Sequence, residues 1–185
     1  MTVTDPTASF TAQRVRRLGV AEHARDVRVV HDLDGILDQV TPESLITTGD
    51  ALWDRWVHDS AFVTPDVLLG LDAGGILPTV AVALAGGIPY RLAWKLDLDL
   101  PHKARFSEPH ARRTDVYTYG DLRGQRVLIV DDEITTGRTL ANLVAVLRTH
   151  GADVTGIACL IEDTSGEARA VMEDLGVPLC TLTRI

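Results

Sequence analysis

Residues 126–140 constrain the fold more than any other part of this chain. The segment begins with four branched apolar residues, 127–130, a run typical of a strand buried on both faces of a parallel sheet. Asp131 and Asp132 follow, and a loop rich in hydroxyl groups, residues 135–139, then opens a helix. Because open α/β sheets bind ligands at the carboxyl ends of their strands, the acids and the loop mark a candidate binding site.

The acids and the loop suit different parts of one ligand. Gly137 permits a tight turn, and hydroxyl and backbone N–H groups at a helix N-terminus bind anions such as phosphate. Two adjacent carboxylates would repel a phosphate by themselves, but they bind sugar hydroxyls and Mg²⁺. The segment therefore predicts a site for a phosphorylated sugar, with Asp131 and Asp132 as metal ligands. The alternative is an ordinary strand-to-helix turn with an acid pair near the helix N-cap.

A second strand-to-helix turn carries Asp72, Ala73, Gly74 and Gly75. Two adjacent glycines let the backbone approach a ligand closely. Taken alone, this turn would be an ordinary glycine-rich connection. Together with the first motif, it predicts a second wall of the same binding site.

Strands and helices alternate from residue 67 onwards, which predicts an α/β fold with a central, mostly parallel, twisted sheet flanked by helices. The expected strands are residues 27–30, 67–71, 90–94, 115–119, 126–130, 154–161 and 179–182, and the expected helices are a short one within 13–28, one beginning at Pro42, and 78–85, 139–150 and 167–175. Residues 96–114 have no clean period and predict a long, mobile loop.

Composition excludes several classes of function. The net charge of −8 argues against nucleic acid as a partner, because phosphate backbones require a basic surface. No apolar run is long enough to span a membrane, and no secretory signal opens the chain, so we expect a cytoplasmic protein without a membrane partner. Cys159 and Cys180 form no C-x-x-C motif and are expected to be reduced and buried.

The first motif, a hydrophobic strand followed by two acids and T-T-G-x-T, resembles the phosphoribosyl-diphosphate (PRPP) motif of type I phosphoribosyltransferases. Residues 29–185 are also similar to xanthine and adenine phosphoribosyltransferases and to purine-repressor effector domains. The resemblance implies a small hood built from the N- and C-terminal segments. It implies a partly flexible extension at 1–26 and a single domain at 27–185, divided into a hood and helix (27–62) and a PRPP-binding core and tail (63–185).

The implied reaction transfers the 5-phosphoribosyl group from PRPP to a nitrogen heterocycle, releases diphosphate and uses Mg²⁺. Relatives are usually dimers, so a homodimer is expected. The implied site residues fall into four groups. They are Asp131, Asp132, Lys95 and Lys103 for catalysis; Thr135, Thr136, Gly137, Arg138 and Thr139 for the 5′-phosphate; Asp72, Ala73, Gly74 and Gly75 for the diphosphate; and Asp38, Ile134 and Asp163 for the base.

The acceptor base is where this sequence departs from its relatives. Xanthine phosphoribosyltransferases carry an asparagine near the position of Asp38 and a lysine at that of Asp163, and both are acids here. An ionised carboxylate accepts hydrogen bonds but cannot donate them, which predicts an amino-substituted base such as adenine. The alternative is that Asp163 points to solvent. Thr135 stands where some relatives carry an aspartate base, so no general base is assigned.

Two other functions stay open. Residues 31–35 resemble the D-x-D-G nucleophile strand of haloacid-dehalogenase-type phosphatases, with Asp32 as the nucleophile. A non-catalytic PRPP-sensing module, like the repressor relatives, is the other alternative. The enzyme is favoured because the segment before Val29 is too short for a DNA-binding domain and the chain is acidic.

Overall fold

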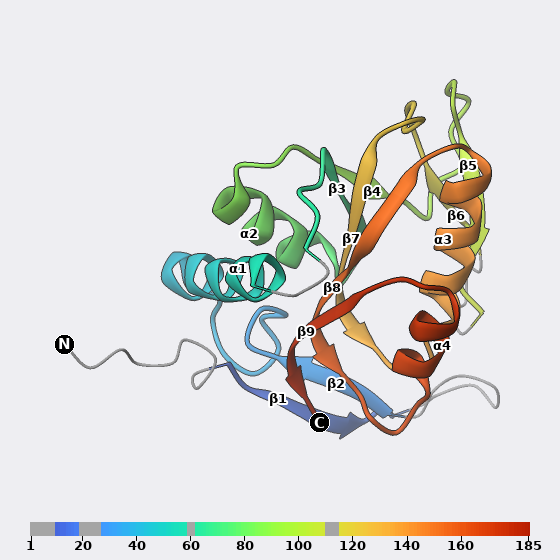
Figure 1. Cartoon of the computed structure of the whole chain (residues 1–185). Coiled ribbons are helices and arrows are strands. Elements are labelled where there is room, and N and C mark those ends of the chain that lie inside the picture. Colours follow the sequence, from blue (N-terminus) through green and yellow to red (C-terminus); the bar gives the residue numbers. More distant parts are fainter. Residues whose placement is uncertain (1–9, 19–26, 59–61, 110–114) are drawn as a thin grey trace.

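The computed structural model describes residues 10–18, 27–58, 62–109 and 115–185. Its centre is a five-stranded parallel sheet in the order β4-β3-β7-β8-β9 (Figure 1). The strands are β3 (Val67–Leu71), β4 (Tyr90–Ala93), β7 (Arg126–Ile134), β8 (Asp153–Glu162) and β9 (Leu179–Arg184). The predicted α/β fold with a mostly parallel sheet is confirmed.

Helices cover both faces of this sheet (Figure 1). They are α1 (Pro42–Val57) and α2 (Ile76–Gly86) on one face, and α3 (Arg138–Thr149) and α4 (Ala168–Asp174) on the other. Val127 and Ile129 of β7 belong to the core cluster that contains Leu143, whereas Leu128 belongs to the cluster that contains Trp56. Alternate residues of one strand thus pack into two cores, as its unbroken apolar run predicted.

Two antiparallel strand pairs lie outside the central sheet. β1 (Ala12–Arg16) pairs with β2 (Val27–His31), and β5 (Ala104–Ser107) pairs with β6 (Asp115–Thr118). The predicted helix within 13–28 is therefore wrong for the residues of β1, whose five positions are too few to establish a period. Residues 1–9 and 19–26, in the extension predicted to be partly flexible, lie outside the described residues.

The predicted loop at 96–114 is wrong in part, because β5 lies within it. Ala104 and Phe106 are buried, and their neighbours in the strand are exposed. The Asn142 side chain donates a hydrogen bond to the Ser107 carbonyl at 2.9 Å and so ties β5 to α3. Four residues with only two apolar side chains give a strand signal too weak to detect in the sequence.

The predicted start of α1 is confirmed. The Thr41 hydroxyl accepts a hydrogen bond from the Ser44 N–H, and the Ser44 hydroxyl accepts one from the Thr41 N–H, each at 3.0 Å. This reciprocal cap satisfies two N–H groups that a helix terminus would otherwise leave unpaired, and Pro42 fits the first turn. No helix in the described part of the chain is both long and apolar enough to cross a membrane.

The order of the strands places the candidate site. β3 and β7 are neighbours in the sheet. From β3 the chain continues through α2 to β4 at one edge, and from β7 it continues through α3 to β8 on the other side. The strand order therefore reverses between β3 and β7, the point at which open α/β sheets bind ligands. The second turn lies directly after β3, and the acids of the first motif lie in the last part of β7, which extends four residues beyond the predicted end at 130.

Candidate active site

A cavity of about 860 Å³ lies at the carboxyl ends of β3 and β7. The first motif and the second turn form most of its wall, and the β1–β2 pair and the loop after β8 complete it. The wall comprises Arg17, Val27, Arg28, Leu71, Asp72, Ala73, Gly74, Lys95, Glu108, Asp131, Asp132, Glu133, Ile134, Thr135, Thr136, Gly137, Arg138, Thr139, Leu140, Ser165 and Gly166. The cavity thus brings together most of the predicted site residues. Gly75, Lys103, Asp38 and Asp163 are not part of its wall.

The pKa values of Asp131 and Asp132 are displaced in opposite directions, although the two residues are adjacent. Burial, and then the charge of Asp132, raise the pKa of Asp131 well above its usual range. Burial also opposes ionisation of Asp132, but the His31 ring and the Asp131 carboxyl lower the Asp132 pKa below its usual value. Burial and mutual repulsion therefore oppose full ionisation of the pair, and a bound cation would offset that repulsion.

The two glycines of the second turn are required by the two acids. A Cβ atom on Gly74 would lie 2.0 Å from Oδ2 of Asp132, and one on Gly75 would lie 2.8 Å from Oδ1 of Asp131. Neither position can carry a side chain without moving an acid. The two motifs, recognised separately in the sequence, therefore form one wall of the cavity.

The predicted phosphate loop lies at the N-terminus of α3. Gly137 caps this helix with a φ of 71°, a left-handed conformation that glycine adopts without steric cost. The Thr135 hydroxyl donates a hydrogen bond to Oε1 of Glu133 at 2.7 Å. Backbone N–H groups and the positive end of the helix dipole then face the cavity, which suits a phosphate group.

The loop after β8 is part of the site, although Asp163 was its only residue with a predicted role. A Cβ atom on Gly166 would lie 2.2 Å from the Thr135 carbonyl oxygen, and the Ala168 N–H donates to that oxygen at 3.0 Å. Ser165 and Gly166 both line the cavity. This segment therefore packs against Thr135 of the predicted phosphate loop and forms part of the cavity wall.

Of the two lysines predicted to act on the leaving group, the structure brings one to the cavity. Lys95 lines it, and its Nζ lies 2.8 Å from Oε2 of Glu108, a second wall residue that the sequence did not single out. Lys103 instead pairs with Asp97 at 2.7 Å. Its Nζ also lies 5.8 Å from the centroid of the Tyr117 ring. Two further cations of the segment 96–114, Arg112 and Arg113, lie outside the described residues.

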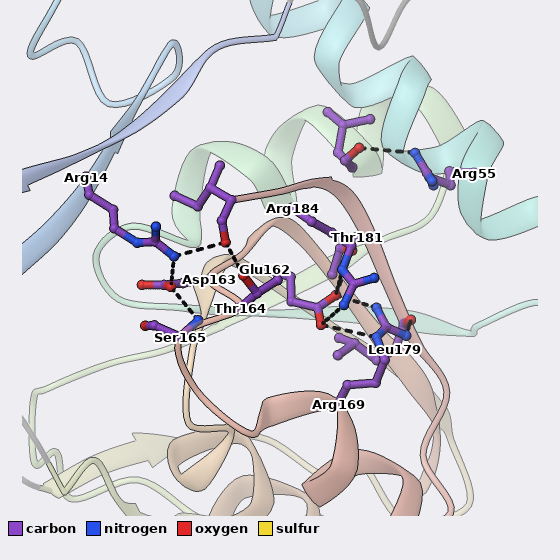
Figure 2. Close-up of polar contacts among 12 residues, drawn as sticks. Arg14, Arg55, Glu162, Asp163, Thr164, Ser165, Arg169, Leu179, Thr181 and Arg184 are labelled. Carbon is purple, nitrogen blue, oxygen red and sulfur yellow. Dashed lines mark hydrogen bonds and ion pairs between the residues drawn. The ribbon is translucent and has the colours of Figure 1, made fainter.

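Asp163 neither lines the cavity nor points to solvent (Figure 2). It is buried, and its Oδ1 lies 2.6 Å from Nη2 of Arg14 and accepts the Ser165 N–H at 3.0 Å. Although burial opposes ionisation, these partners lower the pKa of Asp163 to about 2. Asp38 is exposed and is also not part of the cavity wall. The two acids that predicted an amino-substituted base are therefore not positioned to contact it in this structure.

The acids of the phosphatase-like segment have local structural roles. Asp32 accepts hydrogen bonds from the backbone and the hydroxyl of Thr11, both at 2.7 Å. Asp34 accepts the N–H groups of His31 and Ile36 at 3.0 and 2.8 Å. Neither acid lines the cavity, so the geometry gives no support to a phosphatase.

Comparison with known proteins agrees with this geometry. A family model described as the phosphoribosyl transferase domain matches residues 42–183. A xanthine phosphoribosyltransferase of Chloroflexus aurantiacus is 31% identical over 94% of this chain and 82% of its own length. An adenine phosphoribosyltransferase of Mesorhizobium japonicum is 35% identical over 70% of this chain and 73% of its own.

A solved structure shares the fold. The adenine phosphoribosyltransferase of Trypanosoma brucei, in complex with AMP, pyrophosphate and ribose-5-phosphate, superimposes with a TM-score of 0.68 at 20% identity. The match covers 97% of this chain and 77% of that protein. The matched family model spans the sheet, its four helices and both cavity motifs. The chain therefore belongs to the phosphoribosyl transferase domain family.

Proposed function

We propose that this protein transfers the 5-phosphoribosyl group from PRPP to a purine and releases diphosphate. One observation carries the proposal: a pair of half-buried acids and a helix N-terminus share a cavity wall with the turn at Gly74, which has no side chain. This wall offers acceptors for sugar hydroxyls beside N–H donors for phosphate. Relatives named for xanthine and adenine support a purine as the acceptor.

The parts of PRPP follow from the chemistry of the wall. The 5′-phosphate would bind the N–H groups at the start of α3, and the ribose hydroxyls would donate to Asp131 and Asp132. The diphosphate would lie along the backbone of residues 72–74, with the ammonium group of Lys95 beside it. In this arrangement the anomeric carbon faces the remaining part of the cavity, where the purine would bind.

The chemistry is displacement at the anomeric carbon. A ring nitrogen of the purine forms the new C–N bond as the C–O bond to diphosphate breaks, and the electron pair of that bond leaves with the diphosphate. Positive charge develops on the sugar, so the negative charge of the acid pair stabilises the transition state. The main contribution of the protein is to position the two substrates and to exclude the water that would hydrolyse PRPP.

The acid pair also fits a magnesium ion. No group of three or more His, Cys, Asp or Glu side chains in the described ranges could hold a metal by itself. Mg²⁺ commonly uses one or two carboxylates together with water and substrate phosphates, and Asp131 and Asp132 provide two carboxylates on the cavity wall. When bound, the ion would neutralise charge on the leaving diphosphate.

The described wall also favours a purine with exocyclic oxygens. Arg28, Ser165 and Ile134 line the cavity, whereas Asp38 and Asp163 do not. A guanidinium group donates hydrogen bonds and accepts none, so Arg28 complements the oxygens of an oxopurine and not the amino group of adenine. We therefore propose a xanthine-like acceptor in place of the amino-substituted base expected from the sequence.

A steady-state assay of diphosphate release tests both proposals. PRPP and Mg²⁺ would be supplied with xanthine, hypoxanthine, guanine or adenine, and with orotate as a non-purine control. We expect turnover with purines and a higher kcat/KM for xanthine than for adenine. Preference for adenine would overturn the proposed base but not the proposed transfer reaction. Calorimetric binding of PRPP without turnover on any base would instead support the sensing module.

A further inference from the structure

His31, the last residue of β2, lies directly behind the acid pair. Its side chain is only 2% exposed and is not part of the cavity wall. Its Nε2 lies 3.7 Å from Oδ2 of Asp132. Asp132 does line the cavity, and 19% of its side chain is exposed there. The histidine is therefore separated from any ligand by the carboxylate that would bind it.

The hydrogen bonds around His31 determine which ring nitrogen carries the proton. The Leu33 N–H donates to Nδ1 at 3.2 Å, so Nδ1 presents a lone pair. In the neutral ring the hydrogen must then be on Nε2, the nitrogen that faces Asp132. The backbone of His31 is held in turn by Asp34, which accepts its N–H at 3.0 Å. Phe10 packs near the ring, with the two centroids 6.0 Å apart.

Nε2 has no hydrogen-bond partner among the described residues, although it is fully buried. A separation of 3.7 Å is too long for a hydrogen bond, and a buried donor without a partner destabilises the fold. A movement of Asp132 of about 0.8 Å would bring its Oδ2 to hydrogen-bond distance. Contacts in catalytic sites are often long without ligand and shorten when substrate binds.

We propose that His31 is a positioning residue for Asp132: in the PRPP complex its Nε2–H donates to Oδ2. This bond leaves Oδ1 of Asp132 to accept a hydrogen bond from a ribose hydroxyl. His31 itself touches neither substrate. The inference rests on the proposed function, since it assumes that Asp132 binds PRPP. It also assigns a role to the β1–β2 pair, which lies outside the matched family region of residues 42–183.

Substitution of His31 by glutamine or asparagine tests whether hydrogen-bond donation by Nε2 matters, or only the packing of the ring. The side-chain nitrogen of H31Q can occupy the position of Nε2, whereas that of H31N reaches only to the position of Nδ1. We expect H31F and H31N to lower kcat/KM for PRPP about 10-fold or more, the usual effect of removing a hydrogen bond to a ligating group. H31Q should recover most of this loss. H58F, at an exposed histidine, is the matched control.

A double-mutant cycle with D132N supplies the decisive readout. If His31 acts through Asp132, H31F should cause less than about a twofold further loss in the D132N background. Melting temperatures would be recorded for every variant. An equal loss in both backgrounds, or equal activities of H31Q and H31N, would overturn the inference. Wild-type turnover tests the proposed function separately, and PRPP affinity by calorimetry gives the same comparison for a protein without turnover.

Discussion

Two neighbouring strands of this sheet each carry a pair of adjacent acids near the carboxyl end, and the two pairs have opposite surroundings. Glu162, the last residue of β8, and Asp163 are buried against arginines: Arg169 and Arg184 contact Glu162, and Arg14 contacts Asp163 (Figure 2). Asp131 and Asp132, in β7, form no ion pair with a lysine or arginine in the part of the chain that the structure describes.

The comparison shows that the partners of an acid pair decide its role. The arginines lower the pKa of Glu162 and of Asp163, so both stay ionised and hold the C-terminal strand to its neighbours. Without such partners, the pKa of Asp131 rises well above its usual range, and the pair faces a cavity. The charges of one pair are compensated by arginines, whereas the other pair faces the cavity in which we propose that Mg²⁺ and ribose hydroxyls bind.

The largest effect is expected at the uncompensated pair. D132N removes the charge beside the reacting sugar, and we expect kcat/KM to fall about 10²–10³-fold. The melting temperature should change little, because no ion pair to a lysine or arginine is lost. Steady-state kinetics and thermal unfolding measure the two effects. Equal activity of D132N and wild type would refute the placement of the ribose at this pair.

A smaller loss is expected from G74A, since its new Cβ would lie 2.0 Å from Oδ2 of Asp132. Displacing a binding group by about 1 Å can cost about 100-fold in rate, so we expect a 10–100-fold lower kcat/KM. G124A is the control for a glycine substitution that moves no acid: a Cβ there meets nothing within 4 Å, although the φ of 71° strains the backbone of an alanine. A fully active G74A would show that Asp132 moves without consequence.

E162Q should lower stability and leave activity nearly unchanged, the opposite of what we expect for D132N. The amide cannot neutralise Arg169 and Arg184, whose guanidinium groups lie 2.5 and 3.2 Å from the Glu162 carboxylate. Because both arginines are partly exposed, we expect a loss of about 1–3 kcal/mol in the free energy of unfolding. Activity at 25 °C should stay within about threefold of wild type. Urea titration gives the stability; a catalytic loss without destabilisation would contradict the assignment.

The smallest effect is a dependence of stability on pH. Because the pKa of Asp163 is about 2 in the folded protein and about 3.8 in the unfolded chain, folding favours the ionised form. Its contribution is complete above about pH 4 and is lost as the pH falls towards 2. Discounted for the exposure of Arg14, it amounts to about 1–2 kcal/mol. The difference in unfolding free energy between wild type and D163N should shrink over this window; a constant difference would reject the ion pair.

The sequence predicted most of the fold and the acidic half of the site, because both depend on local patterns. The apolar run before Asp131 predicted a strand with two buried faces, and Gly137 predicted the turn into α3. Both are confirmed, as is the cap at Thr41. These features involve residues close in sequence, whose geometry depends little on the rest of the chain.

The features that the sequence did not reveal depend on contacts between distant residues. Asp163 looked like a base-binding acid because nothing in the sequence shows that Arg14 reaches it from β1. His31 was read as part of a phosphatase-like motif, and its approach to Asp132 arises only when β2 packs beside the sheet. Lys95 and Lys103 were predicted to have the same role, but Lys95 pairs with Glu108 on the cavity wall and Lys103 pairs with Asp97 outside it.

The fit of the acids against Gly74 and Gly75 has an evolutionary consequence. A side chain can enter the second turn only if the first motif makes room, so the two loops are expected to vary together among homologues. Libraries that mutate one loop while fixing the other would sample mostly inactive proteins. A new chemistry at this cavity would be reached by exchanging both loops as one cassette.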